Sequence, residues 1–225
     1  MEFLNRVVSV LTSPRAAFAE IVGEPRIEEG VLLAAFYAVL AGLGTMISSA
    51  KVTYIIEGVD LPQGFSMGGE GMATLVLLGA IASIFILWFI VAAFVRGISA
   101  AFGGRGNYRM MLSASAYSAL PLIVTTAIVA VLYYLSSPYT MTTTISGFYS
   151  VNIEFSQQYY SDTYLPWVNI LNLSGPALCA PLWFGAIREV EGLTFNRTFG
   201  ALVLLYVIFY GITLGLALLG FGMIS

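Results

Sequence analysis

Side chains that could act as nucleophiles, bases or metal ligands are scarce in this chain. It has no His and a single Cys, Cys179. Without His, the Ser-His-Asp and Cys-His arrangements, the His-containing zinc sites and the usual proton shuttle are excluded. Cys179 can form neither an internal disulfide nor a Cys-x-x-Cys motif, and its apolar surroundings indicate a packing residue. We therefore expect no catalytic residue, no cofactor and no metal site, and we predict that the protein is not an enzyme.

The most abrupt change of chemistry along the chain lies in "APLWFGAIREVEGLTF", residues 180–195. There a long apolar run gives way to Arg188, Glu189 and Glu191. The charge of Arg188 suits both a headgroup layer and the negative end of a helix dipole. Glu189 and Glu191 are expected to remain in water, and Gly192 is expected to supply a turn. The stretch is thus predicted to mark the end of a membrane span. It would also be a binding site if a partner contacts these charges.

A second group of charged residues lies in "FGGRGNYR", residues 102–109. This stretch lacks the G-x-x-x-x-G-K-[ST] spacing of a phosphate-binding loop, so nucleotide binding is not predicted. We interpret it as a flexible cytoplasmic turn whose arginines face anionic lipid headgroups. The expected partners are membrane lipids and either a second copy of the chain or another membrane protein, and nucleic acid is not expected. Over both stretches, the candidate contacts with a partner or with headgroups are Arg105, Arg109, Arg188 and Glu189.

The composition indicates what must surround these residues. Hydrophobic residues make up 59% of the 225 and charged residues only 9%, whereas soluble domains carry about a quarter charged residues. Too few polar side chains are present to cover a water-exposed surface, so the bilayer must be the solvent. We predict an all-α integral membrane protein, a five-helix bundle that forms a single domain over residues 1–225. The predicted spans are residues 30–50, 72–95, 110–135, 166–187 and 198–224.

The basic residues set the predicted orientation. Eight of the nine Lys and Arg fall on one side of the predicted bundle, namely Arg6, Arg15, Arg26, Arg96, Arg105, Arg109, Arg188 and Arg197. The other side has only Lys51. The positive-inside rule then places the N-terminus in the cytoplasm and, after five spans, the C-terminus outside. We expect a multi-pass protein of the cell membrane.

Residues 1–29 are predicted to form cytoplasmic amphipathic helices. Apolar residues recur at helical spacing on one face of each helix, as Leu4, Val7, Val8 and Leu11 in the first and as Phe18, Ile21 and Val22 in the second. Both helices would lie along the cytoplasmic membrane surface. An equal alternative is that they pack on the bundle as a plug, because amphipathicity cannot distinguish the two surfaces.

The outer loop, residues 136–165, has no basic residue. β-branched and aromatic residues flank Ser146 and Gly147, which predicts a β-hairpin over the outer mouth of the bundle. A loop of this length is often functional, and a variable cap without a ligand is an equal alternative.

Polar and helix-breaking residues gather in the fourth predicted span, as Asn169, Asn172, Pro176 and Pro181. Each proline frees a backbone carbonyl, and a broken helix at mid-membrane is a common way to build a transport site. The simpler interpretation is a kinked helix whose asparagines hydrogen-bond to neighbouring spans. No predicted span carries an ionisable residue in its central part, which argues against an ion-coupled pump. In the fifth span, Gly211 and Gly215 form a G-x-x-x-G pair that fits helix packing or dimerisation.

Three stretches, in this order, resemble the Yip family of multi-spanning proteins, called Ypt- or Rab-interacting in eukaryotes. They are "LTSPRAAFAEI" near the start, "GGRGNYRMMLSASAYSALPLIV" at the third span and "AIREVEGLTFNRTFGALV" before the fifth. The residues that match the family's Tyr-x-x-Leu-Pro and Arg-Glu-Val-x-Gly-Leu motifs are Tyr117, Leu120, Pro121, Arg188, Glu189, Gly192 and Leu193. The resemblance covers essentially the whole chain and implies five spans with a cytoplasmic N-terminus.

What the resemblance implies for function is narrower. Eukaryotic members bind prenylated Rab GTPases in vesicle formation between endoplasmic reticulum and Golgi, but this chain is similar to the short archaeal or bacterial form, so a Rab role is not carried over. One hypothesis is a non-enzymatic adaptor or bilayer-shaping scaffold that acts through the cytoplasmic face. The other is a permease-like or channel-like protein that moves a lipid or small amphiphile along kinked third and fourth helices. We favour the first, because no span carries a buried ionisable group.

Overall fold

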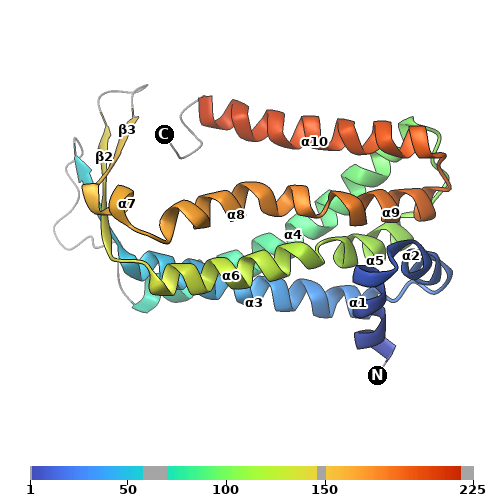
Figure 1. The fold of residues 1–225 in the computed structure, drawn as a ribbon, viewed down its shortest axis with the longest axis horizontal. Coiled ribbons are helices and arrows are strands. Elements are labelled where there is room, and N and C mark those ends of the chain that lie inside the picture. Colours follow the sequence, from blue (N-terminus) through green and yellow to red (C-terminus); the bar gives the residue numbers. More distant parts are fainter. Residues whose placement is uncertain (1, 58–69, 146–150, 219–225) are drawn as a thin grey trace.

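The computed structural model describes residues 2–57, 70–145 and 151–218 as a bundle of helices with a small sheet at one end (Figure 1). The helices are α1 (Glu2–Thr12), α2 (Pro14–Gly23), α3 (Ile27–Lys51), α4 (Glu70–Ala101), α5 (Tyr108–Ser118), α6 (Leu120–Leu135), α7 (Gln157–Ser161), α8 (Leu165–Leu178), α9 (Ala180–Glu191) and α10 (Phe195–Leu218). The strands are β1 (Val52–Glu57), β2 (Tyr139–Ile145) and β3 (Val151–Phe155).

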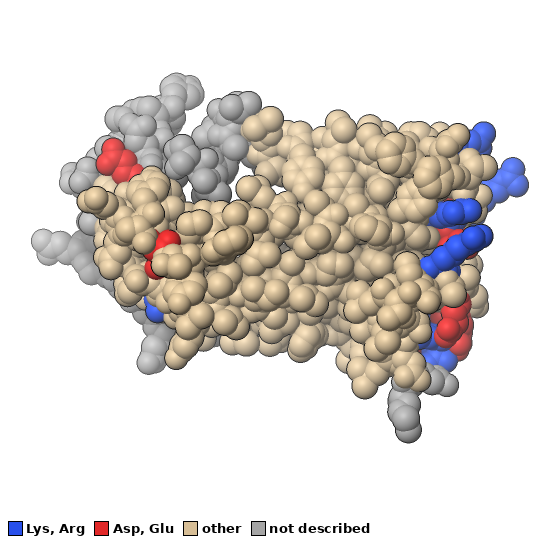
Figure 2. Space-filling view, viewed as in Figure 1, with Lys and Arg blue, Asp and Glu red and all other residues tan. Residues whose placement is uncertain are grey.

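Five helical segments of the described chain are long and apolar enough to cross a membrane. They are α3, α4 from Leu77 onward, α5 with α6, α8 with α9, and α10 as far as Gly215. The five predicted spans are therefore confirmed in length and composition, while their orientation stays a prediction. Figure 2 shows Lys and Arg side chains gathered at one end of the bundle, which is called the arginine-rich end below.

Two of the spans are each built from two helices. The third is interrupted at Ala119 and the fourth at Cys179. In each case a proline, Pro121 or Pro181, lies in the first turn of the new helix, where its missing N–H costs no hydrogen bond. Pro176 lies inside α8 without ending it. Of the two prolines expected to break the fourth span, Pro181 marks the break.

Two helices extend further than predicted at the arginine-rich end. α4 continues to Ala101, so Arg96 lies within a helix and not in a loop as expected. α9 continues to Glu191, four residues beyond the predicted end of the span at residue 187. Gly192 then adopts a left-handed conformation, with φ of 63°, and ends the helix. This confirms the turn predicted at that glycine.

The most enclosed part of the bundle is α5, in which residues 111–118 are all buried. It contacts α2, α3, α4 and α9. Its small side chains allow close approach, and Trp88 of α4 donates a hydrogen bond to Oγ of Ser115 at 2.9 Å. Phe18 and Ile21 of α2 are buried in the same core. α2 therefore packs on the bundle, which is the second of the two alternatives left open for this helix.

A three-stranded sheet lies at the opposite end of the bundle (Figure 1). β2 and β3 pair antiparallel, with Met141 opposite Phe155 and Ile145 opposite Val151, so the predicted hairpin is confirmed. Its turn, including residues 146 and 147, lies outside the described residues. β1, which follows the first span, pairs in parallel with β2, a pairing that the alternation of residues did not indicate.

Candidate functional site

Glu191, the last residue of α9, is buried, although it was expected to remain in water. Its Oε2 accepts a hydrogen bond from the backbone N–H of Gly106 at 2.9 Å and lies 3.4 Å from Nη1 of Arg96. Its backbone carbonyl accepts from the N–H of Arg105 at 3.1 Å. The expectation is wrong because the longer α4 brings a counter-charge beside the carboxylate. The loop between α4 and α5 is thereby fastened to the end of α9.

The glycines of this loop are explained by its close contact with α9. A Cβ at Gly104 would lie 2.5 Å from Oε2 of Glu191, and a Cβ at Gly106 would collide with the carbonyl of Val190. Gly103 has a φ of 89°, a conformation that favours glycine. The loop was expected to be a flexible turn, but it is packed against the helix end.

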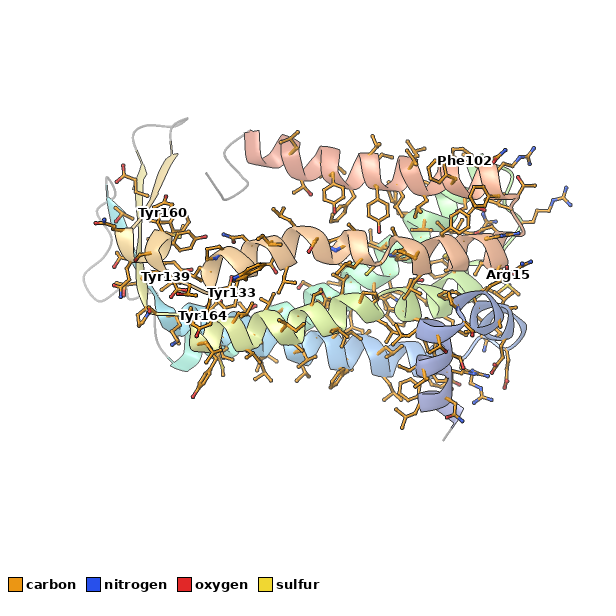
Figure 3. All side chains as sticks on the ribbon, viewed as in Figure 1. Arg15, Phe102, Tyr133, Tyr139, Tyr160 and Tyr164 are labelled. Atoms are coloured by element: carbon orange, nitrogen blue, oxygen red, sulfur yellow. The ribbon has the colours of Figure 1, made fainter. Side chains whose placement is uncertain are left out.

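Phe102 extends the same contact to the last span. Its ring lies against α10, where a Cβ at Gly200 would come within 2.8 Å of Cε1 (Figure 3). The loop therefore holds α9 and α10 together at the arginine-rich end.

A second ionic network is centred on Arg6 of α1. The buried guanidinium donates hydrogen bonds to Glu20 at 2.9 Å, Glu24 at 3.1 Å and Glu29 at 3.2 Å. Burial opposes the charge of Arg6, but its hydrogen bonds to Glu20 and Glu29 outweigh that effect and raise its pKa. The hydroxyl of Tyr117 donates to the same Oε2 of Glu29. The network joins α1, α2, α3 and α5, so the N-terminal segment is fixed to the bundle.

Arg26 adds positive charge to the accessible side of this network. It lies 2.8 Å from Oε1 of Glu24 and 3.4 Å from Oε1 of Glu29. The hydrogen bond from Arg26 holds the pKa of Glu24 below its usual value. A shallow depression of about 550 Å³ lies beside the network, lined by Glu24, Pro25, Arg26, Glu28, Glu29 and Arg109. Both signs of charge therefore meet at its rim.

The four predicted contact residues do not form one cluster. Arg105 and Arg109 are exposed, and Arg109 belongs to the rim of the depression. Glu189 of α9 lies 3.4 Å from Nε of Arg15, whose side chain is 77% exposed. Such a surface pair contributes only about 0–1 kcal/mol. Arg188 is half-buried, so the accessible cations among the four are Arg105 and Arg109.

The remaining motif residues occupy structural positions. Tyr117 belongs to the Arg6 network, and Leu120 and Pro121 form the first turn of α6. Gly192 ends α9, and Leu193 is buried in the core. Their surroundings are those of residues that hold the helices of the arginine-rich end in place.

The polar residues of the fourth span lie apart from one another. Nδ2 of Asn169 donates to the hydroxyl of Tyr159 at 2.8 Å, which ties α8 to α7, whereas Asn172 is exposed. Gly175 packs on α6, where a Cβ would lie 3.1 Å from Oγ1 of Thr125. These are the contacts of a kinked helix packed against its neighbour.

Two tyrosines that sequence reasoning missed join α10 to α8. The hydroxyl of Tyr206 donates to the carbonyl of Pro176 at 2.6 Å, and that of Tyr210 donates to the carbonyl of Leu173 at 3.2 Å. Pro176 is in the last turn of α8, and its carbonyl also accepts a hydrogen bond from the N–H of Cys179 at 3.1 Å. The available signal was the i, i+4 spacing of the two tyrosines, which places them on one face.

Gly211 and Gly215 make no such contact. Within the described part of the chain, nothing lies within 4 Å of the position of a Cβ at either glycine. The pair therefore does not serve close packing among the described residues, and its use in dimerisation stays a prediction.

Comparison with known proteins gives one match. The family described as the Yip1 domain matches residues 8–219, which include both stretches that meet at Glu191 and all five candidate spans. No curated protein and no solved structure matches the chain. Proteins of the matched family are generally non-enzymatic membrane trafficking proteins. With nearly the whole length matched, the chain belongs to the Yip1 domain family of multi-pass membrane proteins.

Proposed function

We propose that this protein is a non-enzymatic adaptor or bilayer-shaping scaffold that acts through its arginine-rich end. The observation that carries the proposal is that two buried ionic networks hold exposed arginines on fixed backbone. A binding group on fixed backbone loses less conformational entropy on association than one on a loose loop. The arginine-rich end is taken as cytoplasmic, in accord with the positive-inside rule.

The two accessible cations of this surface are presented differently. The backbone of Arg105 is hydrogen-bonded to the carbonyl of Glu191, while its side chain is exposed. Arg109 lies in the first turn of α5, whose N-cap Asn107 accepts a hydrogen bond from the N–H of Met110 at 2.9 Å. Guanidinium groups suit carboxylates, which they bind in a planar, two-point geometry. The partner we propose is the acidic segment of a membrane protein, either another protein or a second copy of this chain.

The proposal treats the chain as the short archaeal or bacterial form of the family. In that setting a Rab GTPase is not the expected partner, and the membrane is the cell membrane. The arginine-rich end would then organise membrane proteins without a GTPase cycle.

The experiment is quantitative partner capture. The protein is purified from its native membranes in mild detergent after crosslinking, and co-purifying proteins are counted per chain. The key variant is Arg105→Ala with Arg109→Ala, and the comparison variant is Arg188→Ala with Glu189→Ala. We expect a near-stoichiometric membrane protein with the wild type and its loss with the first variant, since those two arginines are accessible.

Two controls decide what such a loss means. The double variant Arg105→Lys with Arg109→Lys keeps the charge, so retention of the partner by it would indicate electrostatic attraction rather than two-point binding. Gln158→Ala, at the opposite end of the bundle, should leave capture unchanged. The proposal fails if no protein is captured in defined ratio, or if the same protein is captured by every variant.

The alternative function, movement of a lipid or amphiphile, is favoured by one observation. Asn172 is exposed on an apolar span that is interrupted at Cys179. A polar side chain there could meet a headgroup during transit. Flux of a labelled lipid in liposomes that contain the purified protein tests this function, and Asn172→Leu should abolish any flux that follows this path.

A further inference from the structure

α1 carries an exposed apolar surface as well as the face that packs on the bundle. Arg6 and Val10 are buried against the bundle. Leu4, Val8 and Leu11, called the α1 ridge below, are 65%, 58% and 55% exposed. An exposed row of three large aliphatic side chains on a short helix is unfavourable in water. The ridge therefore needs an apolar environment that the described chain does not supply.

Helical geometry separates the ridge from the polar side of α1. The three ridge residues, four and three positions apart, fall on one narrow strip. Asn5 and Ser9 lie on the strip between the ridge and the buried Arg6. The surface of α1 is thus divided into three parts, one against the bundle, one polar and one apolar. This is the division expected of a helix with protein, water and lipid on its three sides.

The position of α1 along the bundle matches that of a membrane interface. The guanidinium of Arg6 lies 3.2 Å from Glu29, in the first turn of α3, where the first candidate span begins. α1 runs across the end of α3 and not along it (Figure 1). The axis of α1 therefore lies in the plane of the membrane, at the depth where the hydrocarbon region would end.

The apolar flank of the bundle continues from this level. Val31, Leu32 and Phe36 of α3 are exposed within the candidate span, so the surface next along α3 is suited to acyl chains. In Figure 2 the charged side chains lie at the two ends of the bundle, most of them at the arginine-rich end, whereas the flank between the ends is tan in this view. The lipid-facing surface of α3 and the α1 ridge therefore begin at the same depth along the membrane normal.

We infer that α1 is an interfacial anchor whose ridge of Leu4, Val8 and Leu11 inserts among the acyl chains of the leaflet at the arginine-rich end. The Arg6 network fixes the rotation of the helix, so the ridge is held toward lipid and Asn5 toward water. A helix seated in this way penetrates about 5–10 Å into one leaflet and expands that leaflet alone. This inference rests on the proposed function. If the protein is a bilayer-shaping scaffold, the α1 ridge is the surface through which it acts on the lipids.

The test measures the depth of single positions in the full chain. A Cys179→Ala background allows one new thiol at a time, placed by Val8→Cys or Leu11→Cys on the ridge and by Asn5→Cys as the matched polar control. Each thiol carries a small fluorophore, and the protein is reconstituted in phosphatidylcholine–phosphatidylglycerol vesicles. Quenching is measured with lipids brominated in the acyl chains and, separately, with iodide in the water.

We expect acyl bromine to quench the two ridge positions severalfold more than Asn5, and iodide to show the opposite order. Iodide quenching of the ridge equal to that of Asn5 would overturn the inference, because the ridge would then lie in water. Protection of the ridge from both quenchers would also overturn it, since a second copy of the chain would then cover the ridge. Two ridge positions are used so that one misfolded variant, detected by circular dichroism, does not decide the outcome. No partner protein is present, so this result and partner capture can fail independently.

Discussion

Gly106 and Glu191, separated by 85 positions in the chain, are joined by a hydrogen bond of 2.9 Å from a backbone N–H to a buried carboxylate. Gly106 belongs to the loop that enters the third span, and Glu191 ends the helix that closes the fourth. Two of the three stretches that resemble the Yip family therefore meet in space. Their contact, with Arg96 as counter-charge, makes the arginine-rich end one structural unit.

Removing the counter-charge should destabilise the protein. Within the described chain, Oε1 of Glu191, Nη1 of Arg96 and Oγ of Ser99 are buried without a hydrogen-bond partner, so the charges of Glu191 and Arg96 compensate each other through their ion pair of 3.4 Å. We expect Arg96→Met to lower the free energy of unfolding by about 2 kcal/mol, below the full cost of a buried pair because Arg96 remains partly exposed. Thermal unfolding in detergent, followed by tryptophan fluorescence, measures the change.

A double-mutant cycle shows whether that loss belongs to the pair. Arg96→Met combined with Glu191→Gln should cost less than the sum of the two single changes, because no uncompensated charge is left. The matched surface pair, Arg15→Ala and Glu189→Ala, should change stability by no more than about 1 kcal/mol. If the changes in the free energy of unfolding at Arg96 and Glu191 are additive, the two side chains do not stabilise each other.

Gly106→Ala should be destabilising because the new methyl group would collide with the carbonyl of Val190. We expect a loss of about 1–3 kcal/mol in the free energy of unfolding, the usual cost of overpacking. Gly97 in α4 provides the control, since nothing lies within 4 Å of the position of its Cβ. Gly97→Ala should be neutral or stabilising by up to about 1 kcal/mol, because alanine is the better helix former. Equal effects at the two glycines would show that the loop can move away.

The elements that follow from hydrophobic length were predictable. A run of about 20 apolar residues has few alternatives to a spanning helix, so all five spans were identified. Their ends were less predictable, since α4 and α9 end six and four residues beyond the predicted positions, and residues 219–224 of the predicted fifth span lie outside the described residues. The hairpin of β2 and β3 was predicted from the β-branched and aromatic residues that flank Ser146 and Gly147. The parallel pairing of β1 with β2 was not predictable, because it joins segments separated by the whole second and third spans.

The ionic networks could be predicted only in part. Glu191 was expected to remain in water, and Arg6 and Arg96 were interpreted only as basic residues on the cytoplasmic side of the bundle. Burial of a charge is decided by partners that lie far away in the chain, such as Glu29 for Arg6 and Gly106 for Glu191. A single sequence gives no record of such distant pairs. Tyr117 was singled out by its motif, but its contact with Glu29 was not.

Tyr117→Phe should weaken the Arg6 network without disturbing packing. The substitution removes the hydroxyl that donates to Glu29, and a hydrogen bond to a charged group contributes about 1.5–3 kcal/mol. Tyr108→Phe is the control, since its exposed hydroxyl donates only to the carbonyl of Phe89, at 3.1 Å. The control should cost no more than about 1 kcal/mol in the same unfolding measurement. If the control costs as much as Tyr117→Phe, the network is not the source of the stability.

The outer loop should lose its anchor in acid. Oδ1 and Oδ2 of Asp162 accept hydrogen bonds from the backbone N–H groups of Ser137, Tyr164 and Leu165 at 2.7–3.0 Å. Burial of Asp162 would raise its pKa, but these hydrogen bonds outweigh burial and hold the pKa below its usual value of 3.8.

Because the pKa in the folded protein is lower than in the unfolded chain, this stabilisation is complete above the unfolded value. It is lost as the pH falls through the folded one. Hydrogen exchange of peptides from residues 136–165, corrected for intrinsic rates, should therefore show protection that falls below pH 3.8 in the wild type. Asp162→Asn should show weaker protection at neutral pH and little further change in acid, since its side chain does not titrate. Peptides from α5, distant from the outer loop, serve as the internal control, and a parallel loss there would mean that acid unfolds the whole bundle instead of releasing one loop.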